Sequence, residues 1–171
     1  MKKKILFLSI LISVTLLFVV GCKNSSTSSV DINGRKFNFI DTYEFNDLKF
    51  KYDKNAKDFV LNEKDEEHTG LIFYKEGTEE DLFRVTITSY KDIKIKSILE
   101  RYELDENSKK TKINGIEWYD YLKTDDSKYR IQVYFYQNKK DSYIISFAVE
   151  KKLRISMSEY IKEFMNNVSF K

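Results

Sequence analysis

Residues 128–149 read KYRIQVYFYQNKKDSYIISFAV and contain two runs in which apolar and polar side chains alternate. A period of two is typical of half-buried strands, because successive side chains point to opposite faces. The polar residues 138–141 between the runs favour a turn. The runs therefore predict an antiparallel pair, whose aligned side chains are Tyr129, Ile131, Val133 and Phe135 in the first strand and Tyr143, Ile145, Phe147 and Val149 in the second.

The same alternation predicts strands earlier in the chain, at residues 36–45, 48–52, 70–74, 82–90, 111–113 and 116–123. Asn33-Gly34, Asn46-Asp47 and Asn114-Gly115 are turn dipeptides, and the last of them predicts a hairpin. Residues 53–67 predict a polar loop with a short apolar anchor at 59–61. These elements follow one another closely, so we expect them to form a meander.

Two stretches change to a helical period. Ile95, Ile98, Leu99 and Tyr102 are spaced as one apolar face and predict an amphipathic helix over residues 93–104. A second apolar stripe runs from Ile161 to Val168, and Ser156 with Glu159 resembles a capping box at its start. Residues 169–171 predict a short closing strand. The expected fold is therefore α+β, with a single antiparallel β-sheet meander and two amphipathic helices packed on it.

The N-terminal segment has a different character. Lys2, Lys3 and Lys4 precede an apolar run over residues 5–20, which is typical of a signal peptide. The run ends at Val19-Val20-Gly21-Cys22, which resembles the lipobox of bacterial lipoproteins. That resemblance implies cleavage before Cys22 and attachment of a diacylglyceryl group, with palmitate-like acyl chains, to its thiol. Two or more chains anchor a protein stably, whereas one holds it only marginally.

The domain organisation follows from this start. Residues 1–21 are interpreted as the lipoprotein signal peptide, 22–30 as the lipidated Cys with a Ser-rich flexible linker, and 31–171 as one domain. An uncleaved transmembrane helix is the alternative, although residues 5–20 are close to the shortest length that spans a bilayer. Cleavage removes three of the 30 basic residues and leaves 27 against 27 acidic ones. A neutral domain gives no electrostatic reason to expect nucleic acid.

A second resemblance concerns the domain itself. Residues 45–52 (FNDLKFKY), 114–119 (NGIEWY), 143–147 (YIISF) and the closing segment 164–170 resemble the PsbP/Mog1/DcrB-like superfamily. The similarity covers about residues 37–171, and its motifs are hydrophobic patterns shared with other α+β folds, such as cystatin-like ones. The Pro that usually follows the first of these strands is absent, since Tyr52 continues into Asp53. Members of that superfamily are mostly non-enzymatic accessory and binding proteins.

Catalytic and metal-binding chemistry has little support in the sequence. The chain has one His, His68, and one Cys, which the lipobox assigns to the lipid, so we expect no metal site and no cofactor. The acidic residues 63–67 and 79–81 lack the spacing of a calcium loop and favour solvated loops. No Gly-x-Ser-x-Gly elbow is present. Asp120, Asp125 and Asp126 are the candidate acid and base residues of an envelope-acting hydrolase, but turn chemistry explains their spacing equally well.

Tyrosines are concentrated on three consecutive predicted strands. Tyr134 and Tyr136 lie opposite the Ile131–Phe135 face, and together with Tyr119 and Tyr121 they are candidates for an exposed partner-binding stripe. The alternative is that a helix covers this face and buries the rings. A flat tyrosine-rich patch would favour binding of a protein or a cell-wall glycan, and a pocket with convergent polar groups would favour a hydrolase.

The sequence thus predicts a non-catalytic binding or accessory lipoprotein, lipid-anchored on the outer face of the cytoplasmic membrane. The alternative is a hydrolase acting on envelope material. The oligomeric state, the ligand and the face of the sheet that the helices cover are left open by the sequence.

Overall fold

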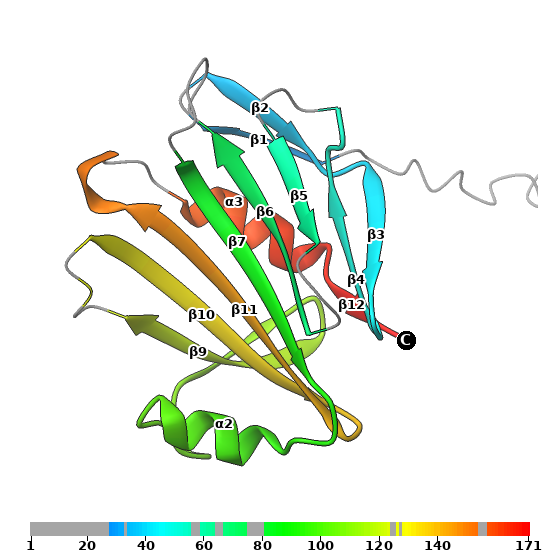
Figure 1. The fold of residues 1–171 in the computed structure, drawn as a ribbon, viewed down its shortest axis with the longest axis vertical. Helices are drawn as coiled ribbons and strands as arrows, with labels where there is room; N and C mark the ends of the chain where they lie inside the picture. The colour runs from blue at the N-terminus through cyan, green and yellow to red at the C-terminus, as the bar shows by residue number, and fades with distance from the viewer. Residues whose placement is uncertain are drawn as a thin grey trace, which may run out of the picture.

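The computed structural model describes residues 28–32, 34–55, 59–63, 67–74, 81–123, 126, 128–153 and 157–171. Most of them form strands (Figure 1). The strands are β1 (Ser29–Ile32), β2 (Arg35–Asn38), β3 (Asp41–Phe45), β4 (Leu48–Tyr52), β5 (Phe59–Glu63), β6 (His68–Tyr74), β7 (Asp81–Tyr90), β8 (Lys110–Ile113), β9 (Ile116–Lys123), β10 (Tyr129–Asn138), β11 (Asp141–Glu150) and β12 (Ser169–Phe170). The helices are α2 (Ile95–Arg101), the 3-10 turn η1 (Lys151–Leu153) and α3 (Ser158–Asn166).

The largest sheet has seven strands in the order β5-β6-β7-β11-β10-β9-β8. Every described pairing in it is antiparallel. The predicted pair of residues 128–149 is confirmed as β10 and β11, joined in register from Tyr129 with Glu150 to Asn138 with Asp141. The chain leaves this sheet after β7, forms α2 and the β8–β9 hairpin, and returns through β10. Strands β7 and β11 are therefore neighbours although α2 and three strands separate them in the sequence.

The expectation of an α+β fold, with a single antiparallel meander and two helices packed on it, was wrong. The protein is mostly β, and β1-β2 and β12-β4-β3 form two further sheets. Residues 36–45 are divided into β2 and β3 by Phe39 and Ile40, so the chain changes sheet there. One edge of β4 pairs with β3 and the other with the C-terminal β12, through Phe170 with Leu48. Alternating side chains identify strands, but they do not specify which strands pair when the partners are far apart in sequence.

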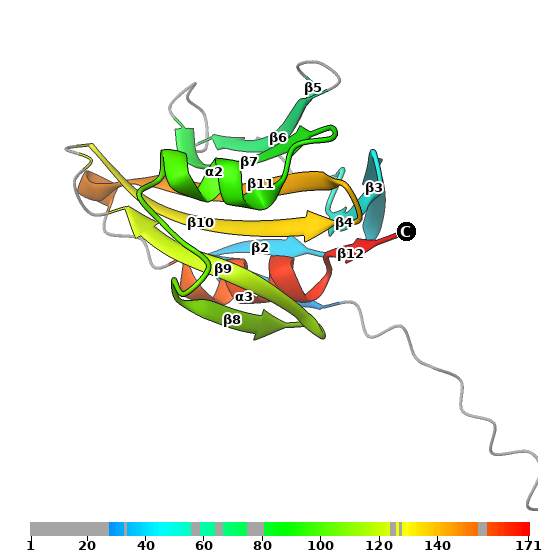
Figure 2. The same ribbon diagram turned by 90° about the horizontal axis from the view of Figure 1, so that it is seen from below.

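Helix α3 contacts the seven-stranded sheet and both smaller sheets, and it lies on the opposite side of the large sheet from α2 (Figure 2). Its Tyr160 ring contacts Phe37 of β2 at a centroid distance of 5.8 Å and Phe83 of β7 at 4.9 Å. Phe164, one turn later, contacts Phe50 of β4 and Phe147 of β11, each at 5.4 Å. The apolar stripe of α3 is therefore buried on both sides, which makes this helix the centre of the main core.

Helix α2 lies on the other face of the seven-stranded sheet. Its Ile98 and Leu99 form a second apolar cluster with Val133, Phe135 and Ile144. The helix is shorter than the predicted 93–104, because the chain adopts a positive φ of 57° at Glu103. The two helices thus cover opposite faces of one sheet and do not share a face.

Two other local predictions needed correction. Residues 59–63, expected to be an anchor within a loop, form strand β5 at the edge of the large sheet. The residue before α3 is Met157, which makes no capping hydrogen bond through its side chain; Ser156, the predicted cap, lies outside the described residues. The predicted closing strand is confirmed as β12.

The buried apolar core of the described chain extends from Val30 to Val168. The described residues from Ser28 to Lys171 therefore build a core of their own. Within the described residues, no helix has the length and apolar character needed to cross a membrane.

Candidate functional site

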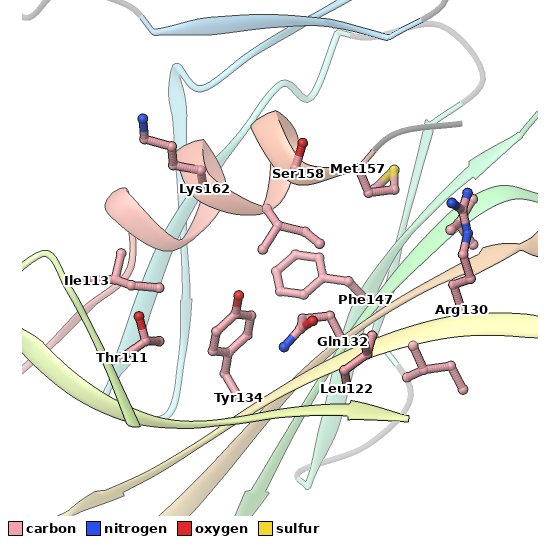
Figure 3. Close-up of a pocket in the computed structure, with 13 residues that line it drawn as sticks. Thr111, Ile113, Leu122, Arg130, Gln132, Tyr134, Phe147, Met157, Ser158 and Lys162 are labelled. Carbon is pink, nitrogen blue, oxygen red and sulfur yellow. The ribbon is translucent and has the colours of Figure 1, made fainter. Parts of the chain in front are cut away.

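A cavity of about 600 Å³ lies between the first turns of α3 and strands β8, β9, β10 and β11 (Figure 3). We call it the α3 pocket. Its volume falls within the roughly 300–1,000 Å³ that is usual for small-molecule sites. Thirteen described residues line it: Thr111, Ile113, Leu122, Arg130, Ile131, Gln132, Tyr134, Phe147, Val149, Met157, Ser158, Ile161 and Lys162.

Strand register determines which side chains face α3. Gln132 pairs with Leu122 of β9 and with Phe147 of β11, and Tyr134 pairs with Asp120 and Ile145. Directly paired residues share a face, so these side chains all lie on the α3 side of the sheet. The helix packs closely against β7 and β11, where Phe83 and Phe147 contact it. The pocket occupies the space between α3 and the β8–β10 side of the sheet.

The walls of the pocket are mainly apolar. Met157, just before α3, and Ile161 of α3 line one side, while Phe147 and Val149 of β11 line another. Leu122 of β9 forms part of the margin and is one of two large apolar side chains in the described chain that are strongly exposed, at 56%. An exposed leucine beside an apolar cavity provides surface that an apolar ligand would cover.

Polar groups are gathered on the floor of the pocket. The side-chain nitrogen of Gln132 donates hydrogen bonds to Asp120 Oδ1 and to the backbone oxygen of Tyr121, the latter at 3.2 Å. Both acceptors can only accept, so the nitrogen of the Gln132 amide must face them. Its oxygen, Oε1, is then left as an acceptor with no hydrogen-bond donor in the described part of the chain.

Asp120 is held in place by a second contact. Lys109, just before β8, forms an ion pair with Asp120 Oδ2 at 2.8 Å, and the Asp120 side chain is only 10% exposed. The Lys109 backbone oxygen also accepts a hydrogen bond from the Asp120 backbone nitrogen at 3.0 Å. The carboxylate is thus fixed behind the Gln132 amide, where its charge acts on the floor of the pocket.

Tyr134 is the other polar group on the floor. It is 7% exposed, and its hydroxyl points into the pocket toward α3. Burial first, and then the negative charge of Asp120, raise the pKa of Tyr134 to about 12. The hydroxyl therefore remains protonated at neutral pH and can donate a hydrogen bond. The described residues supply no partner for it.

The structure separates the four tyrosines that were expected to form one stripe. Tyr134 and Tyr136 face α3, where Tyr136 packs on Trp118 at 5.3 Å and on Phe170 at 4.8 Å. Tyr119 and Tyr121 lie on the opposite face, beside the α2 cluster. Phe135 pairs with Tyr119 and Val133 pairs with Tyr121, so these odd-numbered residues share one face of the sheet. Tyr134 and Tyr136 are even-numbered and therefore point to the other face.

Of the candidate hydrolytic residues, only Asp120 lies beside the pocket, where it accepts from Gln132 and pairs with Lys109; Asp126 and His68 are not among the residues that line it. Asp126 accepts hydrogen bonds from the backbone nitrogens of Lys128 and Tyr129, at 2.8 and 2.6 Å, and these bonds lower its pKa. Asp125 lies outside the described residues. His68 is on β6, paired with Thr88 and away from the residues that line the pocket. In the described residues, no group of three or more His, Cys, Asp or Glu side chains could hold a metal ion.

Cys22 and its recognition residues Val19, Val20 and Gly21 lie outside the described residues. The acidic residues 64–66 and 79–80 also lie outside them.

Sequence reasoning did not find the α3 pocket, and in particular it missed Gln132. Its sequence context is an ordinary alternating strand, and only the pairing with Asp120 on a distant strand gives the amide its orientation. One feature could have pointed to it: Gln132 and Tyr134 are polar or amphipathic residues on the same face of a strand, and covering of that face by a helix was one of the two alternatives left open.

Comparison with known proteins adds information on the fold alone. In sequence, the chain matches no known protein family and no curated protein. Among solved structures, it is similar to a protein from Bacteroides thetaiotaomicron, with a TM-score of 0.50 and 16% identity. The likeness covers 73% of this chain and 45% of that one, so the chain spans less than half the length of that protein. At this identity the likeness concerns the fold and carries no activity across. The resemblance to the PsbP/Mog1/DcrB-like superfamily stays a prediction.

Proposed function

We propose that this protein is a lipid-anchored lipoprotein on the outer face of the cytoplasmic membrane, and that its domain binds a small, largely apolar molecule in the α3 pocket without transforming it. The α3 pocket is the observation that carries the binding role. It combines apolar walls, an exposed Leu122 at its margin and a few oriented polar groups, which is the usual composition of a ligand site.

The membrane anchor is supported by the sequence. The Val19-Val20-Gly21-Cys22 lipobox gives the thiol to be acylated, and residues 23–27, which precede Ser28 and strand β1, give a polar tether. The core begins at Val30, so a chain cleaved before Cys22 retains every buried residue described above. A short linker would hold the pocket within a few nanometres of the bilayer.

A binding role is favoured over hydrolysis by the chemistry of the pocket. The described lining residues include no His, Cys, Asp or Glu, which are the commonest general bases, and the hydroxyl of Tyr134 stays protonated at neutral pH because its pKa is raised. A hydrolase with two carboxyls also needs one acid whose pKa is raised. The resolved shifts of described carboxyls, at Asp41, Glu44, Asp126 and Glu150, are all downward because of neighbouring cations and backbone N–H groups.

The binding role can be tested with the neutral fluorescent probe N-phenyl-1-naphthylamine and residues 28–171. We expect its fluorescence to rise on addition of the protein, and the rise to be lost in Ile161→Trp, which fills the pocket from α3. Ile95→Trp on α2 is the matched control, since it adds the same ring on the opposite face of the sheet. Equal probe binding by both variants would exclude the α3 pocket as the site.

The anchor is tested separately in the full chain. We expect mass spectrometry of the mature protein to show Cys22 as the first residue, with a diacylglyceryl group attached. Cys22→Ala should move the protein out of the detergent phase in a phase-partition assay. An intact Met1, or a variant that still partitions with the detergent, would contradict the anchor.

A further inference from the structure

The floor of the α3 pocket has a defined hydrogen-bonding direction. Gln132 has both amide hydrogens directed to Asp120 and the Tyr121 backbone oxygen, so it presents only its Oε1 acceptor to a ligand. Rotating the amide would place its oxygen against a carboxylate and a carbonyl, which is electrostatically unfavourable. A ligand group that settles against Gln132 must therefore bring its own donor.

Tyr134 complements this acceptor. It lies two residues along β10, on the same face, and points its hydroxyl into the pocket. The hydroxyl can donate to a ligand oxygen while the ligand donates to Gln132. A hydroxyl group or a carboxamide offers a donor and an acceptor within one small group, so either can satisfy both side chains.

The charge behind the floor opposes an acidic ligand. Asp120 pairs with the exposed Lys109 through Oδ2, but its Oδ1 lies beside the Gln132 amide and its charge still raises the pKa of Tyr134, so the negative charge reaches the place where a ligand head group would sit. The cations that line the pocket, Arg130 and Lys162, lie at its sides, with their charged ends directed away from Tyr134 (Figure 3). A ligand carboxylate at the floor would place its oxygens, which can only accept hydrogen bonds, against Gln132 Oε1. It would also bring its negative charge towards that of Asp120.

We propose that the α3 pocket selects a neutral amphipathic molecule whose hydroxyl or carboxamide group donates to Gln132 Oε1 and accepts from Tyr134, in preference to the corresponding carboxylate. The apolar walls formed by Ile161, Val149 and Met157 would hold the rest of the molecule. This assignment rests on the proposed function, since it names the class of ligand for the same pocket.

Four probes of equal chain length test the assignment: octanamide, octan-1-ol, octan-2-one and octanoate. Each is measured by displacement of N-phenyl-1-naphthylamine from residues 28–171 at pH 7. We expect octanamide and octan-1-ol to bind about tenfold more tightly than octanoate, a difference of about 1.4 kcal/mol. Octan-2-one, which accepts but cannot donate, should also bind more weakly than octanamide.

Two variants separate the donor from the acceptor. Gln132→Leu should weaken the binding of octanamide and octan-1-ol several-fold and leave the binding of octan-2-one almost unchanged, because only the first two can donate a hydrogen bond to Oε1. Tyr134→Phe removes only the hydroxyl, and it should weaken the binding of octanamide and of octan-2-one to a similar extent. Tyr119→Phe is the control, since it removes a hydroxyl from the opposite face of the neighbouring strand.

The wild-type measurements decide the proposal even if a variant fails to fold. Octanoate binding as tightly as octanamide, or octan-2-one equalling octanamide, would overturn the assignment of a donor-bearing ligand. Failure of all four probes to displace bound N-phenyl-1-naphthylamine would overturn it as well. If N-phenyl-1-naphthylamine itself does not bind, the proposed function fails, and the assignment fails with it.

Discussion

The side-chain amide of Asn114 donates a hydrogen bond of 3.0 Å to the backbone oxygen of Val168, 54 residues later in the chain. Asn114 forms the turn of the β8–β9 hairpin with Gly115, and both residues have positive φ angles, of 50° and 79°. Val168 follows α3 and directly precedes β12. This contact joins the β8–β9 side of the large sheet to the C-terminal segment, so the hairpin turn helps to fix the position of α3 above the pocket.

Two replacements of Asn114 should separate the contribution of its hydrogen bond to Val168 from that of its positive φ. Asn114→Gly keeps the positive φ and loses the hydrogen bond to Val168, so we expect it to lower the free energy of unfolding by about 1 kcal/mol. Asn114→Ala also places a Cβ in the left-handed region, which costs about a further 1–2 kcal/mol. Urea unfolding of residues 28–171 measures both variants. Equal stability of the two would show that the turn conformation carries no strain cost.

The core between the sheets can be tested at Phe164. Its ring is fully buried and contacts Phe50 of one sheet and Phe147 of another, so removing it leaves a cavity at the centre of the molecule. We expect Phe164→Ala to lower the free energy of unfolding by about 3–5 kcal/mol. Asn166→Ala, at an exposed position near the end of the same helix, should change it little. A loss below about 1 kcal/mol in Phe164→Ala would contradict the central place of α3 in the core.

Features of this structure that depend on neighbouring residues could be predicted from the sequence, whereas features that depend on residues far apart in the chain could not. The β10–β11 hairpin and the Asn114-Gly115 turn follow from neighbouring residues, and both were predicted. The pairing of β12 with β4 depends on residues more than 100 positions apart, through Phe170 and Leu48, and alternation alone does not encode it. The pocket was missed for the same reason, because Asp120 orients Gln132 only after β9 has paired with β10.

Glu44 gives the protein a dependence on acid pH. Lys171 and Lys49 lie 2.6 and 2.5 Å from its two carboxylate oxygens, and these contacts lower the pKa of Glu44 to about 2. The folded pKa lies below the unfolded value, so the stabilising contribution is present above the unfolded pKa and is lost as the pH falls from about 4.5 through about 2.

We therefore expect the urea midpoint of the wild type to fall over this pH range by more than that of Glu44→Gln. Glu106→Gln is the control, because Glu106 is exposed and makes no ion pair with the described part of the chain. Because the ion pairs of Glu44 are exposed to solvent, raising the salt concentration should reduce the difference. Parallel pH profiles of wild type and Glu44→Gln would contradict a role for these ion pairs.

Tyr134 should titrate late, which offers a direct probe of the pocket floor. Burial and the charge of Asp120 raise its pKa to about 12, so the ring resonance of Tyr134 in ¹³Cζ-tyrosine NMR spectra should remain that of a phenol well above pH 10. The raised folded pKa means that its stabilising contribution is complete below the ordinary value of 10 and is lost as the pH rises through about 12. Asp120→Asn removes the charge but leaves the burial, so it should lower the pKa of Tyr134 only part of the way towards 10.

The same variant should strengthen octanoate binding in the pocket while changing octanamide binding less, because it removes the charge that opposes an acid. A Tyr134 pKa that does not respond to Asp120→Asn would show that the carboxylate does not act on the pocket floor, and would remove the electrostatic argument for a neutral ligand.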